Sequence, residues 1–388
     1  MSSKDQSKYS FWERNSFIDY DFIVIGSGIL GLSAACEIKE RSPERSVLIL
    51  ERGILPSGAS TKNAGFACFG SLTEILADIK KSGEQSTKEV VKNRFEGIGL
   101  LRQRLGDEKI GYLNFGGYEL ISDENISSIE QIEFVNKMLS DIFEKQPFDL
   151  RNDLVSKFGF DSSYVKALVM SPYEGQIDTG KMMRCLIDYA VSLGIRIING
   201  CSAESFSEKE NYVRVNVQSI SEKNESFFNC KTLIACTNAF TEKIFPNFKV
   251  TPGRGQVLVT KPISDLKFEG VFHFDEGYYY FRNFENRIIF GGARNLDFES
   301  ERTTEFNTNE IIYNHLLEKL DTIILPGQKY EIDYTWSGIM GFNEAKKPEV
   351  KKISDRIFSA ISCNGMGIAL SPFVARGLLN VLNLDFQD

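Results

Sequence analysis

Three glycines near the N-terminus have the spacing of a phosphate-binding turn. An apolar, β-branched run ends at Gly26, and Gly28 and Gly31 follow it at the start of a predicted helix. The first glycine of such a turn permits a tight bend, the second lets the backbone approach a pyrophosphate, and the third lets the helix pack closely on the strand. Glu51, 20 residues past Gly31, stands where a carboxylate accepts hydrogen bonds from ribose hydroxyls. This pattern predicts a dinucleotide site rather than a glycine-rich turn without a ligand.

The segment after Glu51 distinguishes between dinucleotides. Residues 53–70 read GILPSGASTKNAGFACFG, which is too rich in glycine and small polar residues for a helix. An NAD-binding unit usually continues with another regular repeat of strand and helix. This segment instead suits an extended, deeply bound cofactor with backbone amides laid along it. An ordinary surface loop is the alternative, but the apolar run 66–69 predicts burial.

The surrounding pattern predicts two kinds of sheet. Strands are expected over 20–26 and 46–51 on either side of a helix over 28–40, which together make a βαβ unit. From residue 250 onward, short strands such as 256–260 and 287–291 alternate with turn residues, as in an antiparallel sheet. The order predicts an α/β fold in which a nucleotide-binding domain is interleaved with a mostly antiparallel domain. Further helices are expected over 72–81, 87–105, 125–144, 181–193, 309–320 and 371–382.

Composition disfavours several classes of protein. The 388 residues carry 45 Lys and Arg against 53 Asp and Glu, and a net charge of −8 makes nucleic acid or an anionic membrane a poor partner. Seven dispersed cysteines indicate free thiols in a reducing compartment. His273 and His315, the two histidines, have no metal-ligand spacing, so we expect neither a metal site nor a His-based triad. The apolar run 22–36 is shorter than the ~20 residues of a membrane span, so we expect no transmembrane segment and a cytoplasmic protein.

Several stretches carry a resemblance to a known family. YDFIVIGSGILGL, LILERG and GASTKNAG resemble the N-terminal part of the D-amino-acid-oxidase-like superfamily of FAD-dependent oxidoreductases, which includes glycine and sarcosine oxidases and γ-glutamylputrescine oxidoreductases. The resemblance continues in order through GIRIINGCSA, LIACTNAF, PGRGQ, the WSG at Trp336 and NGMGIALSPFVARG. It implies a Rossmann-type FAD-binding domain interleaved with a mostly antiparallel β-sheet substrate domain. Relatives can attach the flavin through cysteine or histidine, but neither Cys68 nor Cys363 stands in such a position, so we expect FAD held without a covalent bond. We expect the FAD-binding domain over 1–85, 160–250 and 335–388, and the substrate domain over 86–159 and 251–334.

The resemblance also implies roles for individual residues in FAD binding. The pyrophosphate is expected to meet the glycine turn, the adenosine ribose to lie at the end of the second strand, and the ribityl chain and flavin to follow the segment after it. A turn before the last helix is expected at the O2 edge of the flavin, where amides stabilise negative charge. In that order the residues are Gly26, Ser27, Gly28 and Gly31; Glu51 and Arg52; Ser60, Thr61, Asn63, Ala64 and Gly65; and Gly365, Met366, Gly367 and Ile368. The resemblance also places Ala203 at the adenine, and Thr237 and Asn238 near the pyrophosphate.

The substrate side departs from the family. Amino-acid oxidases of this family commonly carry, after the WxG strand, an arginine that pairs the substrate carboxylate, and here Met340 stands in its place. Arg254 and Arg282 are each either an anion partner or a structural charge. Tyr278, Tyr279 and Tyr280 alternate on a strand, so at least one of them faces the substrate or all pack in the core. We name Arg254, Tyr278, Tyr280 and Met340 as candidate catalytic residues.

These features predict oxidation of the C–N bond of an amine or amino acid by hydride transfer to flavin N5, with oxygen or another acceptor taking the electrons. An amine bound neutral needs no side-chain base, which agrees with the scarcity of histidine. The rival is C–O oxidation, as in L-2-hydroxyglutarate dehydrogenases, which needs a base. His273 is the only candidate for that base in the antiparallel region, and we expect it on the surface. An NAD-dependent dehydrogenase and a flavin-binding protein without activity are the other classes.

Overall fold

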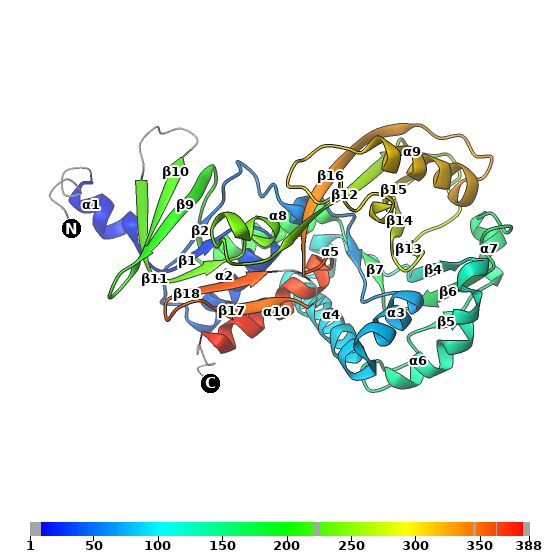
Figure 1. Cartoon of the computed structure of the whole chain (residues 1–388), viewed down its shortest axis with the longest axis horizontal. Helices are drawn as coiled ribbons and strands as arrows, with labels where there is room; N and C mark the ends of the chain where they lie inside the picture. The colour runs from blue at the N-terminus through cyan, green and yellow to red at the C-terminus, as the bar shows by residue number, and fades with distance from the viewer. Residues whose placement is uncertain (1–8, 220–225, 344–346, 362, 383–388) are drawn as a thin grey trace.

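The computed structural model describes residues 9–219, 226–343, 347–361 and 363–382. Two large sheets, each of eight strands, lie next to each other along the long axis of the molecule (Figure 1). Both contain segments from distant parts of the sequence, so the chain crosses between them repeatedly. In the described residues no helix is long and apolar enough to cross a membrane. All seven cysteines are free thiols.

The first sheet has the parallel centre that the βαβ pattern predicts. β1 (Asp19–Ile25) pairs in parallel with β2 (Val47–Leu50) on one side and β11 (Ser226–Ala235) on the other. Both faces are covered, which is why β2 is apolar at every position and wholly buried. The remaining strands are β8 (Arg196–Ile198) and β18 (Ile357–Ile361), which pair in parallel, and β9 (Cys201–Glu208), β10 (Val213–Ser219) and β17 (Glu349–Lys352), which pair antiparallel.

Helices cover one face of this sheet and share its main hydrophobic core. They are α2 (Ile29–Arg41), α4 (Glu84–Leu105), α8 (Thr179–Ser192) and α10 (Gly367–Val381). α4 and α10 cross so closely that a Cβ on Gly97 would lie 1.9 Å from the carbonyl oxygen of Ala369. The last helix was predicted to start at residue 371. It starts at Gly367 instead, because Pro372 is accommodated inside the helix rather than near its beginning.

The second sheet is mostly antiparallel, as predicted. Its strands, in spatial order, are β16 (Ile332–Phe342), β12 (Thr251–Thr260), β15 (Arg287–Gly292), β14 (Tyr279–Phe284), β13 (Val271–Phe274), β4 (Gly117–Ile121), β6 (Ala167–Ser171) and β5 (Asp149–Leu150). Only β13 and β4 pair in parallel among these neighbours. β6 belongs to this sheet, although the range 160–250 was predicted to belong to the FAD-binding domain, and β16 begins before the expected limit at 335.

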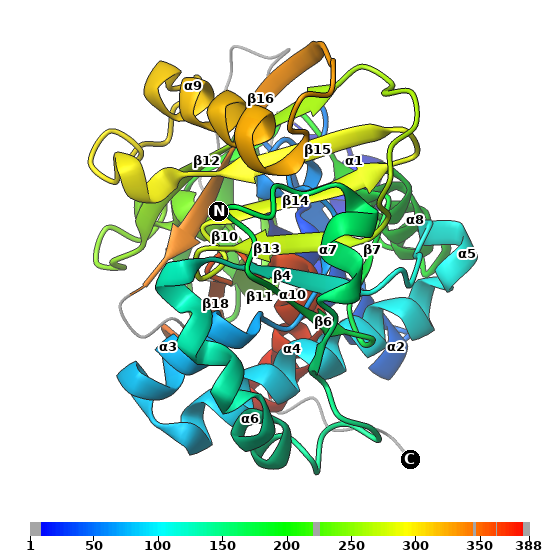
Figure 2. The same cartoon turned by 90° about the vertical axis from the view of Figure 1, so that its right-hand side faces the viewer.

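The face of the second sheet turned away from the first sheet carries a phenylalanine-rich core. Figure 2 looks onto this side of the molecule, with α7 (Asp153–Phe158) and α9 (Glu310–Lys319) on it. Phe272 and Phe281 stack there with their ring centroids 4.7 Å apart. The opposite face is turned toward the first sheet, and the candidate site lies there.

One predicted helix is wrong in part. In place of a helix over 125–144, the structure has a 3₁₀ segment, Asp123–Gln131, followed by α6 (Ile132–Met138). Small polar residues such as Ser127 and Ser128 compete for backbone hydrogen bonds and disfavour an α-helix at its start. The helix ends early because Ser140 bonds back to the carbonyl of Lys137 with its N–H at 3.3 Å and its hydroxyl at 2.9 Å.

The remaining elements connect these layers. α3 (Leu72–Ser82) packs with α4 and α6 around a smaller core, and β3 (Phe66–Ala67) pairs with β7 (Gly175–Gln176). The short helices are α1 (Phe11–Glu13), the π-helical turn Arg14–Ile18, α5 (Asp107–Ile110), the 3₁₀ turns Ala59–Thr61, Asn238–Lys243 and Arg294–Leu296, and the π-helical turn Leu320–Ile324.

Candidate functional site

The glycine turn has the geometry that the motif predicts. Gly26 has φ +102°, and a Cβ there would lie 2.7 Å from the carbonyl oxygen of Cys236. A Cβ on Gly31 would lie 1.9 Å from the carbonyl oxygen of Gly26, so α2 can approach β1 only with glycine at this position. Gly28 is the N-cap of α2, so the N-terminus of the helix opens at the turn, where an anion is stabilised.

Glu51 is tied to this turn by hydrogen bonds. The Ser27 N–H and hydroxyl donate to Glu51 Oε2 at 3.0 Å and 2.9 Å, and the Gly53 N–H donates to Oε1 at 3.0 Å. A carboxylate has about four acceptor positions, so one remains for a ribose hydroxyl. Ser60 also lies at the turn, since its hydroxyl oxygen accepts the Ile29 N–H at 2.9 Å. The structure thus brings three predicted cofactor residues, Ser27, Glu51 and Ser60, to the start of α2.

The segment that was predicted to run beside the ribityl chain is a rigid, folded connection. The Asn63 side chain donates to the Ser60 carbonyl at 2.8 Å and accepts the Gly65 N–H at 2.9 Å. Thr61 donates its hydroxyl to the Pro56 carbonyl at 2.6 Å. Gly65 has φ +77°, and a Cβ there would lie 2.2 Å from the Ile177 carbonyl oxygen. Ala67, Cys68 and Phe69 are buried and Phe66 is half-buried, so this segment is no surface loop.

The remaining predicted cofactor residues of the first sheet lie near the ends of its parallel strands. Ala203 is in β9, whose start is fixed by a bond from the Cys201 N–H to the Glu51 carbonyl at 2.8 Å. Arg52 is exposed, and its guanidinium lies 3.7 Å from the ring centroid of Phe240. Asn238 has φ +46° and follows Thr237 directly after β11. These positions fit an adenosine at the carboxyl edge of the sheet, where ligands of open α/β sheets bind.

The turn before α10 reaches the second sheet. Gly365 has φ +86°, Met366 is the N-cap of α10, and the helix begins with Gly367 and Ile368. The Met340 sulfur lies 3.6 Å from the Cβ position of Gly365. The Asn343 N–H donates to Asn364 Oδ1 at 3.0 Å, so the end of β16 is fixed to the same turn.

One face of the second sheet is lined by glycines, and this glycine face is turned toward the cofactor residues. Paired strand residues point to the same side of a sheet. Gly253 pairs with Met340, Gly255 with Gly338, and Gly291 with Tyr280. The glycine face is therefore defined by Gly253, Gly255, Gly291 and Gly338 together with Met340 and Tyr280. Since a Cβ on Gly255 would lie 2.8 Å from the Met340 methyl, and one on Gly291 2.9 Å from the Tyr280 hydroxyl, glycine lets both side chains lie flat.

The segment around Asn63 covers part of the glycine face. The Trp336 indole N–H donates to the Lys62 carbonyl at 2.9 Å, and the Phe66 ring meets the Tyr280 ring edge-on at 5.6 Å between centroids. Four features therefore lie close together: the glycine turn at the N-terminus of α2, the carboxylate of Glu51, the glycine-rich segment around Asn63, and the glycine face. This set of residues fits an extended dinucleotide.

Comparison with known proteins agrees with this geometry. A family model described as FAD dependent oxidoreductase matches residues 21–380. The chain belongs to this FAD-dependent oxidoreductase family. Its cofactor is therefore FAD, bound without a covalent link, as the sequence predicted. The probable oxidoreductase OrdL of Haemophilus influenzae is 25% identical over 381 residues, which cover 92% of this chain and 81% of that protein.

Solved structures share the fold of this oxidoreductase. Glycine oxidase from Geobacillus kaustophilus matches with a TM-score of 0.75 at 18% identity, over 94% of this chain and 95% of its own. L-proline dehydrogenase from P. horikoshii matches with a TM-score of 0.74 at 18% identity, over 94% and 93%. L-amino acid deaminase from Proteus myxofaciens, solved in complex with anthranilate, matches with a TM-score of 0.73 at 14% identity, over 94% and 90%. The predicted superfamily, fold class and oxidoreductase activity are confirmed.

Two arginines of the oxidoreductase serve its architecture. Arg254 lies on the opposite face from Gly253, buried, and its guanidinium bonds both oxygens of Glu301 at 2.8 Å and 2.7 Å and Asn307 at 3.1 Å. This buried ion pair argues against the predicted contact of Arg254 with substrate, because the guanidinium is already bonded. The sequence alone gives no sign that Glu301 is its partner. Buried Arg282 donates to the Ala64 carbonyl and, at 3.1 Å, to Gln176, and burial lowers its pKa to about 10.

The three tyrosines take different positions. Tyr279 is buried in the phenylalanine core on the far face, and Tyr280 lies on the glycine face, where burial raises its pKa to about 12. Tyr278 precedes β14 and is 38% exposed, with its ring 6.2 Å from that of Phe298. Met340 and Tyr280 are thus the candidate catalytic residues that the fold brings together.

The predicted surface position of His273 is wrong. Its side chain is buried on β13, on the same face as Tyr280, with its ring 5.1 Å from that of Phe66. Its Nε2 lies 3.8 Å from Glu174 Oε2 and has no hydrogen-bond partner in the described part of the chain. Burial lowers the pKa of His273 to about 4 and raises that of Glu174 to about 8, so both are neutral at pH 7. The sequence missed Glu174 because it lies in a turn after β6, whose position depends on the tertiary fold.

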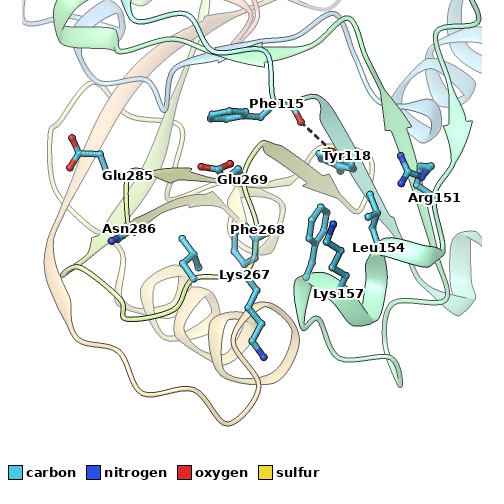
Figure 3. A pocket seen from close by; sticks show the side chains of 12 residues that line it. Phe115, Tyr118, Arg151, Leu154, Lys157, Lys267, Phe268, Glu269, Glu285 and Asn286 are labelled. Atoms are coloured by element: carbon cyan, nitrogen blue, oxygen red, sulfur yellow. Dashed lines mark hydrogen bonds between the residues drawn. The ribbon is translucent and has the colours of Figure 1, made fainter.

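A cavity of about 500 Å³ lies elsewhere in the molecule. Its lining side chains come from β4 and α7 and the residues just before them, from the connection before β13, and from the turn between β14 and β15. Figure 3 shows the Tyr118 hydroxyl bonded to the Phe115 carbonyl, a bond of 3.2 Å. None of the predicted cofactor or catalytic residues lines it.

The sequence also did not single out Arg294, whose guanidinium reaches the glycine face at Gly253.

Proposed function

We propose that the chain oxidises the C–N bond of an amine or amino acid held over the glycine face. The observation that carries this proposal is the absence, among the described side chains of that face, of a group suited to take a hydroxyl proton. His273 is the one imidazole there, and its pKa near 4 makes it a weak base. Its free nitrogen faces Glu174, and Phe66 packs against its ring. A neutral amine needs no such base, whereas an alcohol does.

We also propose the predicted residues as the FAD contacts. Gly26, Ser27, Gly28 and Gly31 hold the pyrophosphate at the N-terminus of α2, with Thr237 and Asn238 beside it. Glu51 and Arg52 hold the ribose and its surroundings, and Ala203 lies at the adenine. The segment with Ser60, Thr61, Asn63, Ala64 and Gly65 follows the ribityl chain. The turn at Gly365, Met366, Gly367 and Ile368 lies at the O2 edge. In this proposal the ranges 1–85, 160–250 and 335–388 form the FAD-binding domain, except that β6 and β16 pair in the second sheet, and 86–159 and 251–334 form the substrate domain.

The chain's own groups then have definite tasks. FAD, when bound, supplies the acceptor for a hydride from the substrate carbon. The dipole and amides at the start of α10 stabilise negative charge next to them. Met340, Tyr280 and Phe66 exclude water and orient the substrate over the face. Oxygen or another acceptor removes the electrons, and the free thiols agree with a reducing cytoplasm.

Anaerobic titration of the purified flavoprotein tests the reaction. We expect the visible flavin bands to bleach on addition of an amine or amino acid from a broad panel, and to stay unchanged with 2-hydroxy acids. Bleaching by a 2-hydroxy acid alone would move the reaction to C–O oxidation, the second candidate, with His273 as base. A fully loaded protein that bleaches with neither class would support a flavoprotein without this activity.

A further inference from the structure

The guanidinium of Arg294 lies at the glycine face and has no hydrogen-bond or ion-pair partner among the described residues. Arg294 follows β15, and its Nη1 lies 2.8 Å from the Cβ position of Gly253, on the face that carries Met340. The guanidinium lies 4.1 Å from the ring centroid of Phe342 and 4.9 Å from that of Phe298. These rings fix the plane of the guanidinium but accept no strong hydrogen bond from it.

No carboxylate within the described chain neutralises this cation. Glu301 is the acid that acts on it electrostatically, but both of its oxygens already accept hydrogen bonds from Arg254. Glu301 Oε1 also accepts the Asn309 amide at 3.0 Å. Across residues 9–219, 226–343, 347–361 and 363–382, the Arg294 side chain forms no hydrogen bond or ion pair, and its backbone carbonyl accepts only the Asp297 N–H at 3.2 Å. Arg254 and Arg282 are bonded, so Arg294 is the arginine of this region that is left to bind an external group.

The setting of Arg294 favours an anion with two oxygens. Burial lowers the pKa of Arg294, but an arginine stays protonated at neutral pH. A half-buried cation between aromatic rings is costly unless an anion pairs with it, and the planar guanidinium matches a carboxylate with two parallel hydrogen bonds. The Tyr280 hydroxyl, which has no partner among the described residues either, lies on the same face and within the electrostatic reach of Arg294. It can supply a second donor.

We propose that Arg294 binds the carboxylate of the substrate, so that the substrate is an amino acid rather than a simple amine. This inference rests on the proposed C–N oxidation, and it gives the glycine face a specificity determinant. With the carboxylate at Arg294 near Gly253, the carbon that loses the hydride is held over the neighbouring positions, beside Met340 and Tyr280. The amino group needs no charged partner.

Binding of simple carboxylates to the FAD-loaded protein provides the test. Acetate and benzoate are titrated while the flavin absorption spectrum is recorded, with acetamide and benzamide as neutral counterparts. We expect Arg294→Gln to raise the dissociation constant of the carboxylates on the order of 10- to 100-fold, because a charge-assisted bidentate contact is lost. Arg294→Lys keeps the charge but not the planar fork, and should fall between the two. Arg302→Gln removes the same charge from an exposed arginine of the same connection and should change nothing.

Anaerobic reduction by matched substrates separates this inference from the proposed function. Phenylalanine of either hand is compared with phenethylamine, its decarboxylated counterpart. We expect the native protein to prefer the amino acid and Arg294→Gln to lose the preference.

If amines and amino acids bleach the flavin equally in both proteins, the proposed function stands and the role of Arg294 is overturned. It is equally overturned if native protein gives no carboxylate-dependent spectrum, or if Arg294→Gln weakens FAD binding while carboxylate binding is unchanged. If carboxylates bind through Arg294 but no amine or amino acid bleaches the flavin, the anion site stands and C–N oxidation fails.

Discussion

The two halves of the candidate site are built in different ways. On the first sheet, the expected cofactor contacts come from short, continuous stretches, and backbone atoms and glycines do most of the work. On the second sheet, the glycine face is assembled from β12, β14, β15 and β16, whose residues lie up to 87 positions apart, as Gly253 and Met340 do. The first half is a local motif, and the second is a product of strand register. Substitutions should therefore act differently on the two halves.

The largest effect should come from the buried ion pair behind the glycine face. In Glu301→Gln, the buried Arg254 guanidinium loses its counter-charge, and we expect a loss of about 3–5 kcal/mol in the free energy of unfolding. Chemical denaturation measures it. Glu331→Gln, which removes the exposed partner of Lys261, is the control and should leave the free energy of unfolding close to that of the native protein. Near-native stability in Glu301→Gln together with lost substrate binding would restore Arg254 as a candidate catalytic residue.

The next effect should come from the glycine turn of the first half. In Gly31→Ala, the new methyl group would lie 1.9 Å from the Gly26 carbonyl oxygen, so α2 must move away from β1. We expect a loss of about 2–3 kcal/mol in stability and a marked fall in FAD content, measured by denaturation and by flavin absorbance. In Gly99→Ala, the control on α4, a Cβ meets no atom within 4 Å, so stability should stay level or rise by up to about 1 kcal/mol.

A smaller effect should appear as a pH dependence that belongs to the second half alone. Burial raises the pKa of Glu174 to about 8 in the folded protein, above its ordinary value, so this group stabilises the fold at low pH and loses that contribution as pH rises toward 8. His273 has its pKa lowered to about 4, so its effect runs the other way and is complete by about pH 6.5. Between pH 6.5 and 8 the acid therefore dominates.

Denaturation midpoints at pH 6.5 and pH 8 should reveal this difference. We expect the native protein to lose on the order of 1–2 kcal/mol of stability between pH 6.5 and pH 8 through ionisation of Glu174. Glu174→Gln should not show this loss. His273→Gln should leave that loss unchanged, and should alter the pH dependence only below about pH 6.5. An identical pH profile in Glu174→Gln and native protein would contradict a protonated Glu174.

The smallest effect should come from Ser27→Ala. The substitution removes one hydrogen bond of 2.9 Å to Glu51 and keeps the backbone bond of 3.0 Å to the same oxygen. We expect stability to fall by about 1 kcal/mol, and FAD to bind several-fold more weakly. Titration of the apoprotein with FAD measures the second effect. If neither quantity changes, Glu51 is held by its other contacts alone.

The sequence by itself determined the first half of the site. Gly26, Gly28 and Gly31 need no distant partner to mark a phosphate-binding turn, since a strand before them and a helix after them complete the motif. The apolar run at Phe66–Phe69 likewise predicted burial of its segment, and the family resemblance fixed the fold and FAD.

The tertiary structure decided the rest, because charge pairing and strand register join residues that are far apart in sequence. Arg254 looked available for an anion until the fold buried it against Glu301. His273 looked like a surface residue until β13 placed it beside Phe66 and Glu174. Arg294 carried no sequence signal at all. The pairing of β12 with β16 brings Gly253 and Phe342 together. The Arg294 guanidinium lies beside them because Gly253 has no side chain to exclude it and the Phe342 ring packs against it.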